Sequence, residues 1–409
     1  HIDQRRLYAP ISKWSAELER GSICATMRKA VAVAMAEQPG PVHLDFPEDT
    51  AEEPAEECPA TEPAALPLLP LFDRKALEAA VALIQKARRP LVAVGLTMNR
   101  AQATGELREL VGKHRLPVVT TLMAKGQVPE DGPLLVGVLG RARREIVAEY
   151  CAPADLVIGI GYDPVEFNYE EWMRKDLPLV HIDTVPADIA GGRTVACQLV
   201  GNIREILKAL LNIPELRHHW DLAALAGHRR RLYDALTPST SGFSPHHAVL
   251  AMRQLLPREG LLSVDVGAHT HLIGQLWEAG GPGSFLVSNG WSSMGFAIPA
   301  AIAAKLVHPD CPVLACVGDG GFLMSVGEIN TAVRLGLPIV IVLLRDNALS
   351  LIKAKQARHG YHFDGVDLFG PGYRSSDNFF GARVVVARQE EEFRVALKQA
   401  LSGNEPVVI

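Results

Sequence analysis

The sequence predicts an α/β protein of several domains, in which parallel sheets are covered by helices on both faces. The chain has 409 residues, more than one hydrophobic core usually supports. Its expected strands are short runs that are apolar on both faces and alternate with helical patterns, as in doubly wound parallel sheets. Glycines and polar residues follow several of these strands, at the edge where such sheets bind ligands.

Composition and charge exclude several classes of protein. Apolar residues make up 48% and charged residues 21% of the chain, as in ordinary globular proteins. A formal net charge of −5 provides no basic field for a nucleic acid. No apolar run has the length of a membrane span, and the six cysteines lack metal-site spacing, which favours free thiols in a reducing compartment. We therefore expect a cytoplasmic protein that binds neither nucleic acid nor membrane.

The first domain, residues 1–52, contributes a helical pattern over 22–37 and an apolar strand over 42–46. Residues 53–70 are rich in Glu, Pro and Ala with no consistent period, which is typical of an extended linker. The chain begins at His1 without a methionine and stops in an expected strand. We therefore expect it to be a fragment.

The middle of the chain, residues 71–211, predicts one doubly wound domain. Asp73 can cap a helix whose apolar positions recur every three or four residues until Pro90. A second helix is expected over 102–114. The expected strands are 91–94, 118–121, 156–160 and 179–183. Residues 212–241 are charged and helical to irregular, and we interpret them as a second linker.

The last domain, residues 242–409, repeats this alternation. Its expected helices are 246–256, 325–335 and 391–401. Its expected strands are 261–266, 313–317, 339–344, 383–387 and 407–409. Because the carboxyl ends of parallel strands share one edge of a sheet, the loops after these strands are candidates for a binding site.

Two of these loops combine glycines with carboxylates. The turn at 318–321 places Asp319 among three glycines, where the backbone can approach an anion closely. The next strand ends at 345–348 with a second carboxylate, Asp346. A Gly-Asp-Gly turn alone is also an ordinary turn, so the interpretation depends on the pair. Two carboxylates beside a phosphate loop predict a shared cation, and Mg²⁺ prefers such oxygen ligands.

The stretch GDGGFLMSVGEINTAVRLGLPIVIVLLRDN resembles the cofactor motif of thiamine diphosphate (ThDP)-dependent enzymes. LYAPISKW, PGPVHLDFPED, LMAKGQVPEDGP and ADLVIGIGYDPVEFNYEEW resemble enzymes of the acetolactate synthase type, and the resemblance covers essentially the whole chain. It implies the end of a pyrimidine-binding domain over 1–52, a central Rossmann-like domain over 71–211 and a diphosphate-binding domain over 242–409.

The resemblance implies ThDP and Mg²⁺ as cofactors and assigns their contacts residue by residue. Metal ligands would be the side chains of Asp319 and Asp346 and the backbone carbonyl of Ala348, with Asn347 as a competing choice. Met294 matches the side chain that wedges between the two cofactor rings. The implied cofactor-binding residues are Gly267, Ala268, His269, Ser292, Met294, Gly318, Asp319, Gly320, Gly321, Asp346, Ala348 and Leu349. The catalytic residue is unassigned, because the family's activating Glu would precede His1.

The implied reaction is the ThDP- and Mg²⁺-dependent decarboxylation of pyruvate and its joining to a second 2-oxo acid, which gives 2-acetolactate, as in branched-chain amino acid biosynthesis. Lys355 or Ala354 stands where biosynthetic members have a Trp that favours 2-oxobutyrate, so pyruvate or an unassigned 2-oxo acid is expected. The alternatives are another ThDP-dependent 2-oxo acid decarboxylase or acetyltransferase, or a non-catalytic ThDP-binding scaffold.

The resemblance also implies partners. Family members bind ThDP between chains, so a homodimer or homotetramer is expected, and a small regulatory subunit is a further implied partner. The strand that ends at Val94 is followed by Gly95 without the GxGxxG pattern of dinucleotide-binding loops. We therefore expect neither NAD nor FAD.

Overall fold

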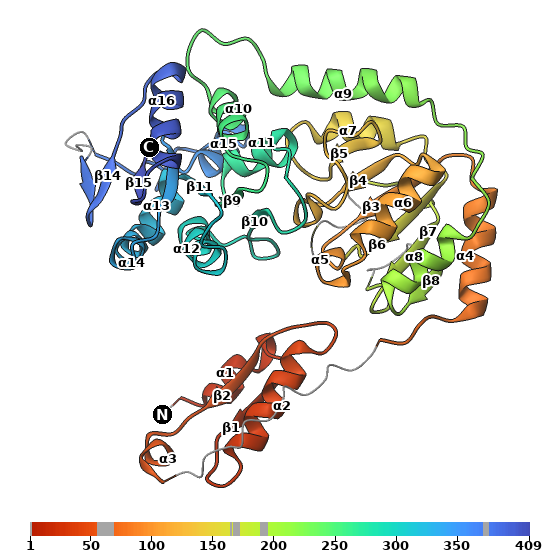
Figure 1. Cartoon of the computed structure of the whole chain (residues 1–409), viewed down its shortest axis with the longest axis horizontal. Helices are drawn as coiled ribbons and strands as arrows, with labels where there is room; N and C mark the ends of the chain where they lie inside the picture. Colours follow the sequence, from red (N-terminus) through yellow and green to blue (C-terminus); the bar gives the residue numbers. More distant parts are fainter. Residues whose placement is uncertain (1, 55–68, 164–165, 167–171, 189–194, 371–375) are drawn as a thin grey trace.

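The structure is a computed structural model that describes residues 2–54, 69–163, 166, 172–188, 195–370 and 376–409. Within these ranges the strands form three sheets, of two, six and seven strands. Figure 1 shows a small N-terminal unit in red, a middle unit in orange to green, and a last unit in teal to blue. The α/β class with parallel sheets is as the sequence predicts.

The N-terminal unit has a two-stranded parallel sheet in which Trp14 pairs with Val42. Its elements are α1 (Gln4–Tyr8), η1 (Ala9–Ile11), β1 (Trp14–Glu17), α2 (Ile23–Met35), β2 (Val42–Asp45) and α3 (Glu48–Glu52). The sequence predicts α2 and β2 but not β1, because the tetrapeptide WSAE has no apolar run. The expected linker at 53–70 falls largely on residues outside the described ranges.

The six-stranded sheet of the middle unit is entirely parallel, with the order β5-β4-β3-β6-β7-β8. Its strands are β3 (Pro90–Val94), β4 (Val118–Thr120), β5 (Leu135–Val138), β6 (Leu156–Ile160), β7 (Leu179–Asp183) and β8 (Val195–Val200). Its helices are α4 (Arg74–Lys86), α5 (Met98–Ala101), α6 (Thr104–His114), η2 (Leu122–Ala124), α7 (Arg144–Cys151) and α8 (Ile203–Leu211). Every residue of β3, β6 and β7 is buried, which explains their continuous apolar runs.

The stretch from 212 to 241, expected to be a linker, contains a four-turn helix, α9 (Leu222–Leu236). Asp221 caps this helix by accepting from the backbone of the first turn. Leu225, Leu232 and Leu236 are buried in the core cluster that also contains Ile146 of α7. This stretch therefore covers the middle sheet as well as connecting two units.

The seven-stranded sheet has the order β10-β9-β11-β12-β15-β14-β13 and is parallel except at β13. Its strands are β9 (Leu261–Val264), β10 (Phe285–Val287), β11 (Val313–Gly318), β12 (Ile339–Leu344), β13 (Asn378–Phe379), β14 (Ala382–Val384) and β15 (Val407–Val408). Its helices are α10 (Pro245–Leu255), α11 (Ala268–Leu276), α12 (Ala297–Val307), α13 (Asp319–Ser325), η4 (Val326–Glu328), α14 (Ile329–Arg334), α15 (Ser350–Arg358) and α16 (Glu390–Leu401). The helix expected over 325–335 begins earlier, at Asp319, because a 3-10 turn joins α13 to α14.

The strand order of the last sheet creates a crevice. In the sheet, β10 lies on one side of β9 and β11 lies on the other. The chain therefore runs from β9 to β10 in one direction and from β11 to β12 in the opposite direction. The loops after β9 and β11 therefore diverge, and ligands of open α/β sheets bind at such a switch point. The switch point of the middle sheet lies between β3 and β6.

The middle sheet's switch point is occupied by the chain itself. The carboxylate of Glu166 accepts from the backbone N–H of Leu96 at 2.6 Å and from the Thr121 hydroxyl. A Cβ at Gly95 would lie 2.6 Å from the same carboxylate. Burial raises the pKa of Glu166 to about 8.

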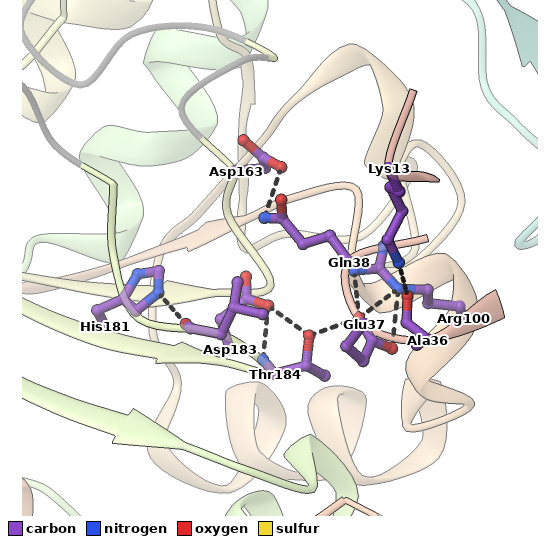
Figure 2. Close-up of polar contacts among 10 residues, drawn as sticks. Lys13, Ala36, Glu37, Gln38, Arg100, Asp163, His181, Asp183 and Thr184 are labelled. Carbon is purple, nitrogen blue, oxygen red and sulfur yellow. Dashed lines mark hydrogen bonds and ion pairs between the residues drawn. The ribbon is translucent and has the colours of Figure 1, made fainter. Parts of the chain in front are cut away.

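The N-terminal unit contacts this same edge of the middle sheet (Figure 2). Arg100 of α5 forms an ion pair with Glu37 at 2.9 Å, and the Thr184 hydroxyl donates to the same carboxylate at 2.9 Å. Gln38 donates to Asp163 at 3.5 Å. These partners follow β3, β6 and β7, so the turn after α2 sits on the carboxyl ends of the buried strands.

No helix within the described ranges is both long enough and apolar enough to cross a membrane.

The expectation that the cysteines are free thiols is wrong for Cys24, which is disulfide-bonded. Cys151 and Cys316 are buried free thiols, and Cys197 and Cys311 are half-buried ones. Sequence spacing does not reveal which cysteines the fold brings together, which is why the sequence could not predict this bond.

Candidate functional site

A cavity of about 890 Å³ lies at the carboxyl edge of the seven-stranded sheet, within the size range of small-molecule sites. Its wall contains residues that end or follow β9, β11, β12, β14 and β15. All twelve residues that the sequence assigns to cofactor binding lie on this wall: Gly267, Ala268, His269, Ser292, Met294, Gly318, Asp319, Gly320, Gly321, Asp346, Ala348 and Leu349. Loops separated by more than 80 residues are thus brought into one site.

Two glycines of the turn after β11 have no room for a side chain. A Cβ at Gly320 would lie 2.6 Å from Leu349 Cδ2 and 2.8 Å from Met294 Cε. A Cβ at Gly321 would lie 2.5 Å from the carboxylate of Asp265. Gly320 therefore sits beneath two apolar side chains of the cavity wall, and any larger residue at this position would have to displace them.

The two carboxylates of the predicted metal site are held by backbone groups. Asp319, only 3% exposed, accepts from Asn347 N at 2.5 Å, from Asp346 N at 3.3 Å and from Gly320 N at 3.1 Å. Burial raises the pKa of Asp319, and the neighbouring negative charge of Asp346 raises it further. Two carboxylates that disfavour each other's charge are a donor set that a divalent cation would stabilise.

The structure distinguishes the two candidates for the second ligand. Asp346 and Ala348 lie on the cavity wall, and Asp346 accepts from Ala348 N at 3.2 Å and from the Ser350 hydroxyl. Asn347 does not lie on the wall, and its side-chain oxygen accepts from Arg345 Nε at 2.6 Å. This arrangement favours Asp346 as the metal ligand.

The loop after β9 presents a histidine to the cavity. His269 is 8% exposed, and burial lowers its pKa to about 4, so the ring is neutral near pH 7. Its Nε2 atom is buried and has no hydrogen-bond partner among the described residues. Such an atom costs free energy unless a ligand or water completes it. It lies at the start of α11, where backbone N–H groups favour an anion.

Asp265 has a structural role that the sequence analysis missed. It is fully buried, and its carboxylate accepts from Gly295 N at 3.0 Å and from Ala297 N at 2.9 Å. The end of β9 is thereby bound to the loop that carries Ser292 and Met294. An Asp directly after an apolar strand is a signal for such a role, but its partners lie 30 and 32 residues away.

Other parts of the wall come from segments that no motif marks. They belong to the start of α10, to α15, to the segment after β14 and to the chain end. These residues include Phe243, Ser244, Pro245, Leu351, Ile352, Lys355, Val385, Val386, Ala387, Arg388 and Ile409. Sequence reasoning singles out Lys355 among them only because it stands in place of a family Trp.

The residues present fit a diphosphate-bearing cofactor with a hard cation. Two carboxylates and a backbone carbonyl supply oxygen ligands, while an open glycine turn and the unpartnered His269 Nε2 face the same cavity. No group of three His, Cys, Asp or Glu within the described ranges could hold a metal alone. A cation would therefore need phosphate oxygens as further ligands, as Mg²⁺ commonly does.

Family comparisons agree with this organisation. Residues 77–210 match the family model described as the central domain of thiamine pyrophosphate enzymes. Residues 265–409 match the model described as the C-terminal, thiamine pyrophosphate-binding domain of the same enzymes. The second match begins at Asp265 and contains every residue of the predicted cofactor site.

Individual relatives extend the similarity over the whole chain. An acetolactate synthase of Bacillus subtilis (strain 168) is 28% identical over 423 residues, which cover 100% of this chain and 73% of the relative. A probable acetolactate synthase large subunit of Methanococcus aeolicus is 26% identical, again over 100% of this chain and 73% of the relative. The large subunit of acetolactate synthase isozyme 1 of Escherichia coli (strain K12) is 29% identical over 94% of this chain and 69% of the relative.

Proposed function

Because the chain belongs to the thiamine pyrophosphate enzyme family, we propose that it decarboxylates pyruvate and joins the two-carbon unit to a second 2-oxo acid, which gives 2-acetolactate. The proposal rests on one observation above the others: a single cavity unites the glycine turn, the two carboxylates and the Met294 loop. The names of the acetolactate synthase relatives support the choice of reaction.

The residues of the cavity have distinct roles in this proposal. Asp319, Asp346 and the Ala348 carbonyl would hold Mg²⁺, and Asn347 stays turned toward Arg345. The turn at 318–321 and the start of α11 would receive the diphosphate through backbone groups.

When bound, ThDP would supply a nucleophilic carbon for the keto carbon of pyruvate and an electron sink for the loss of CO₂. The second 2-oxo acid accepts the two-carbon unit at its own keto carbon, and the resulting alkoxide takes up a proton. Met294 and Leu349, which converge over Gly320, would fix the cofactor's position from the apolar side.

The test is an assay of the full-length protein with pyruvate, ThDP and Mg²⁺, in which CO₂ release and 2-acetolactate are measured separately. We expect both products in equal amounts. CO₂ with free acetaldehyde would instead indicate a simple decarboxylase, and acetyl transfer to another acceptor would indicate an acetyltransferase. Calorimetric binding of ThDP without any CO₂ would favour the non-catalytic scaffold and contradict the proposal.

We also propose that the protein acts as at least a dimer. Trp291, beside the cofactor loop, is 95% exposed, and Met324 of α13 is 62% exposed. Exposed apolar side chains around a ligand site are typical of an interface. Sedimentation equilibrium, with and without ThDP, measures the assembly, and a monomer at micromolar concentration in both conditions would contradict it.

A further inference from the structure

Lys355 is one of the basic residues of the cavity wall whose charge the proposed reaction does not use. It lies on α15 beside Leu351 and Ile352, which also line the cavity. Lys353, two residues earlier, is absent from the wall and forms an ion pair with Asp367 at 2.8 Å. Within the described ranges Lys355 forms no ion pair, so its ammonium group is available to a ligand.

The charged residues of the wall are unevenly distributed. Its only acids within the described ranges are Asp319 and Asp346, both in the metal loops. Its basic residues are Arg345, Lys355 and Arg388. Once a cation occupies the two carboxylates, every charged side chain left on the wall is positive. Arg345 stacks on Phe369 and donates to Asn347, so the wall's cations with no side-chain partner among the described residues are Lys355 and Arg388. Of these two, Lys355 lies on α15, the helix that follows the metal loop at 345–348.

Further positive charge stands behind this part of the wall. Burial lowers the pKa of His271 on α11, and the positive charges of Arg141, Arg144 and Lys355 lower it further. Arg141 packs against Gly274 of the same helix, and its buried Nε has no hydrogen-bond partner among the described residues. Its pKa falls to about 10, so it stays charged at neutral pH.

The acid near Arg141 is engaged elsewhere. The charge of Glu166 raises the pKa of Arg141, but the Glu166 carboxylate accepts hydrogen bonds from Leu96 N and from the Thr121 hydroxyl. No ion pair joins Glu166 to Arg141 within the described ranges. Among the described residues, neither Arg141 nor Lys355 forms an ion pair with an acid.

Building on the proposed function, we propose that Lys355 binds a second negative charge on the acceptor, so that the preferred acceptor is a 2-oxo acid with an anionic group at its far end. Five residues separate Lys355 from Ser350 at the start of α15, a rise of about 7.5 Å along the helix. The donor's reacting carbon must lie against the cofactor near Gly320 and Leu349. Lys355 is thus placed beyond the reacting atoms, where the distal group of an acceptor would lie.

The test compares acceptors of similar shape that differ in the charge at the far end. With pyruvate as donor, kcat/KM is measured for 2-oxoglutarate and for its 5-methyl ester, whose far end is uncharged. We expect the wild-type protein to prefer the acid about tenfold or more, as for a hydrogen bond to a charged group. Lys355→Gln should reduce the preference to near one, whereas the matched control Lys353→Gln should keep it. Higher salt should weaken the preference, since Lys355 is exposed.

A binding measurement separates this inference from the proposed function. Calorimetry of the ThDP- and Mg²⁺-loaded protein with succinate and with succinamate requires no turnover. Tighter binding of succinate, lost in Lys355→Gln, supports the anion subsite even if no acetolactate forms. Equal binding of the two, or an acid-to-ester ratio of kcat/KM near one in an active wild-type protein, overturns the inference. If Lys355→Gln lowers kcat/KM equally for the acid, the ester and pyruvate, then Lys355 binds the carboxylate that all three share, and the inference is also wrong.

Discussion

A buried ion pair between Lys125 and Glu130 joins the middle unit to the last one. The two side chains are 1% and 3% exposed, and Lys125 Nζ lies 2.6 Å from the Glu130 carboxylate. Lys125 also donates to the Gly274 carbonyl of α11 at 3.1 Å, and Glu130 accepts from Ala279 N, just after that helix, at 3.2 Å. The pair therefore fixes α11, whose first turn carries His269 of the cofactor site.

We expect Lys125→Met to destabilise the fold strongly. The change leaves the Glu130 charge buried, and removal of one partner of a buried pair costs about 3–5 kcal/mol. Glu130 keeps two backbone donors, Gly126 N at 2.8 Å and Ala279 N, which places the loss near the lower end, about 3 kcal/mol. That is a change of more than about 100-fold in the equilibrium between folded and unfolded protein.

The double variant Lys125→Met, Glu130→Gln removes both charges. Gly126 N and Ala279 N bond different oxygens of Glu130, so the single amide oxygen of Gln keeps an acceptor for one of them. The double variant should therefore recover part of the loss, because no unpaired charge stays buried. Urea unfolding followed by tryptophan fluorescence measures each variant. A loss below about 1 kcal/mol in the single variant, or a double variant that equals the sum of two singles, would refute the reasoning.

Three further variants test the site and the middle sheet. Asp319→Ala should reduce ThDP affinity at least 100-fold with little change in circular dichroism, because one carboxylate is left to hold the cation; normal calorimetric binding would remove Asp319 from the metal site. Asp265→Asn should cost about 1.5–3 kcal/mol in urea unfolding, because its charge-assisted bonds to Gly295 N and Ala297 N are weakened; an unchanged midpoint would show that the loop holds itself. Burial raises the pKa of Glu166 in the folded protein to about 8, above its ordinary 4.5. Its contribution to the free energy of unfolding is therefore present at low pH and is lost as the pH rises from about 4.5 to about 8. Glu166→Gln should flatten that part of the plot of stability against pH, and parallel wild-type and variant curves would contradict the shift.

The parts of the fold that the sequence predicts are those whose burial is complete. β3, β6 and β7 are buried on both faces, so each appears as an uninterrupted apolar run. The first four residues of β8 alternate between half-buried and exposed, and β1 is nowhere fully buried, so neither leaves such a run. The sequence predicts a linker where the structure has α9. Three consecutive arginines interrupt the helical spacing of the leucines that are buried in the core.

The sequence predicts those parts of the site in which one loop contains all the informative residues. The turn at 318–321 and the carboxylate of Asp346 can be identified in the sequence by residue type and by their position after expected strands. Which residue of the pair Asp346 and Asn347 faces the cavity depends on the left-handed backbone at Asn347, with φ of 64°, which no composition signal encodes. The positive group around His271 was not predictable, because its members lie on three different elements or loops.

The two large parallel sheets use their switch points in opposite ways. In the last sheet, Gly320 lies under flexible side chains and its turn faces an open cavity. In the middle sheet, Gly95 faces its own chain: a Cβ there would lie 2.5 Å from the backbone of Tyr162, and the neighbouring N–H of Leu96 is bound by Glu166. In dinucleotide-binding folds, the backbone N–H groups at this position donate to a phosphate of the ligand. Here the N–H of Leu96 donates to the side chain of Glu166 instead. A flavin or nicotinamide nucleotide would have to displace a buried carboxylate, so we interpret the middle unit as a scaffold that positions α11 and Arg141 beside the cofactor cavity.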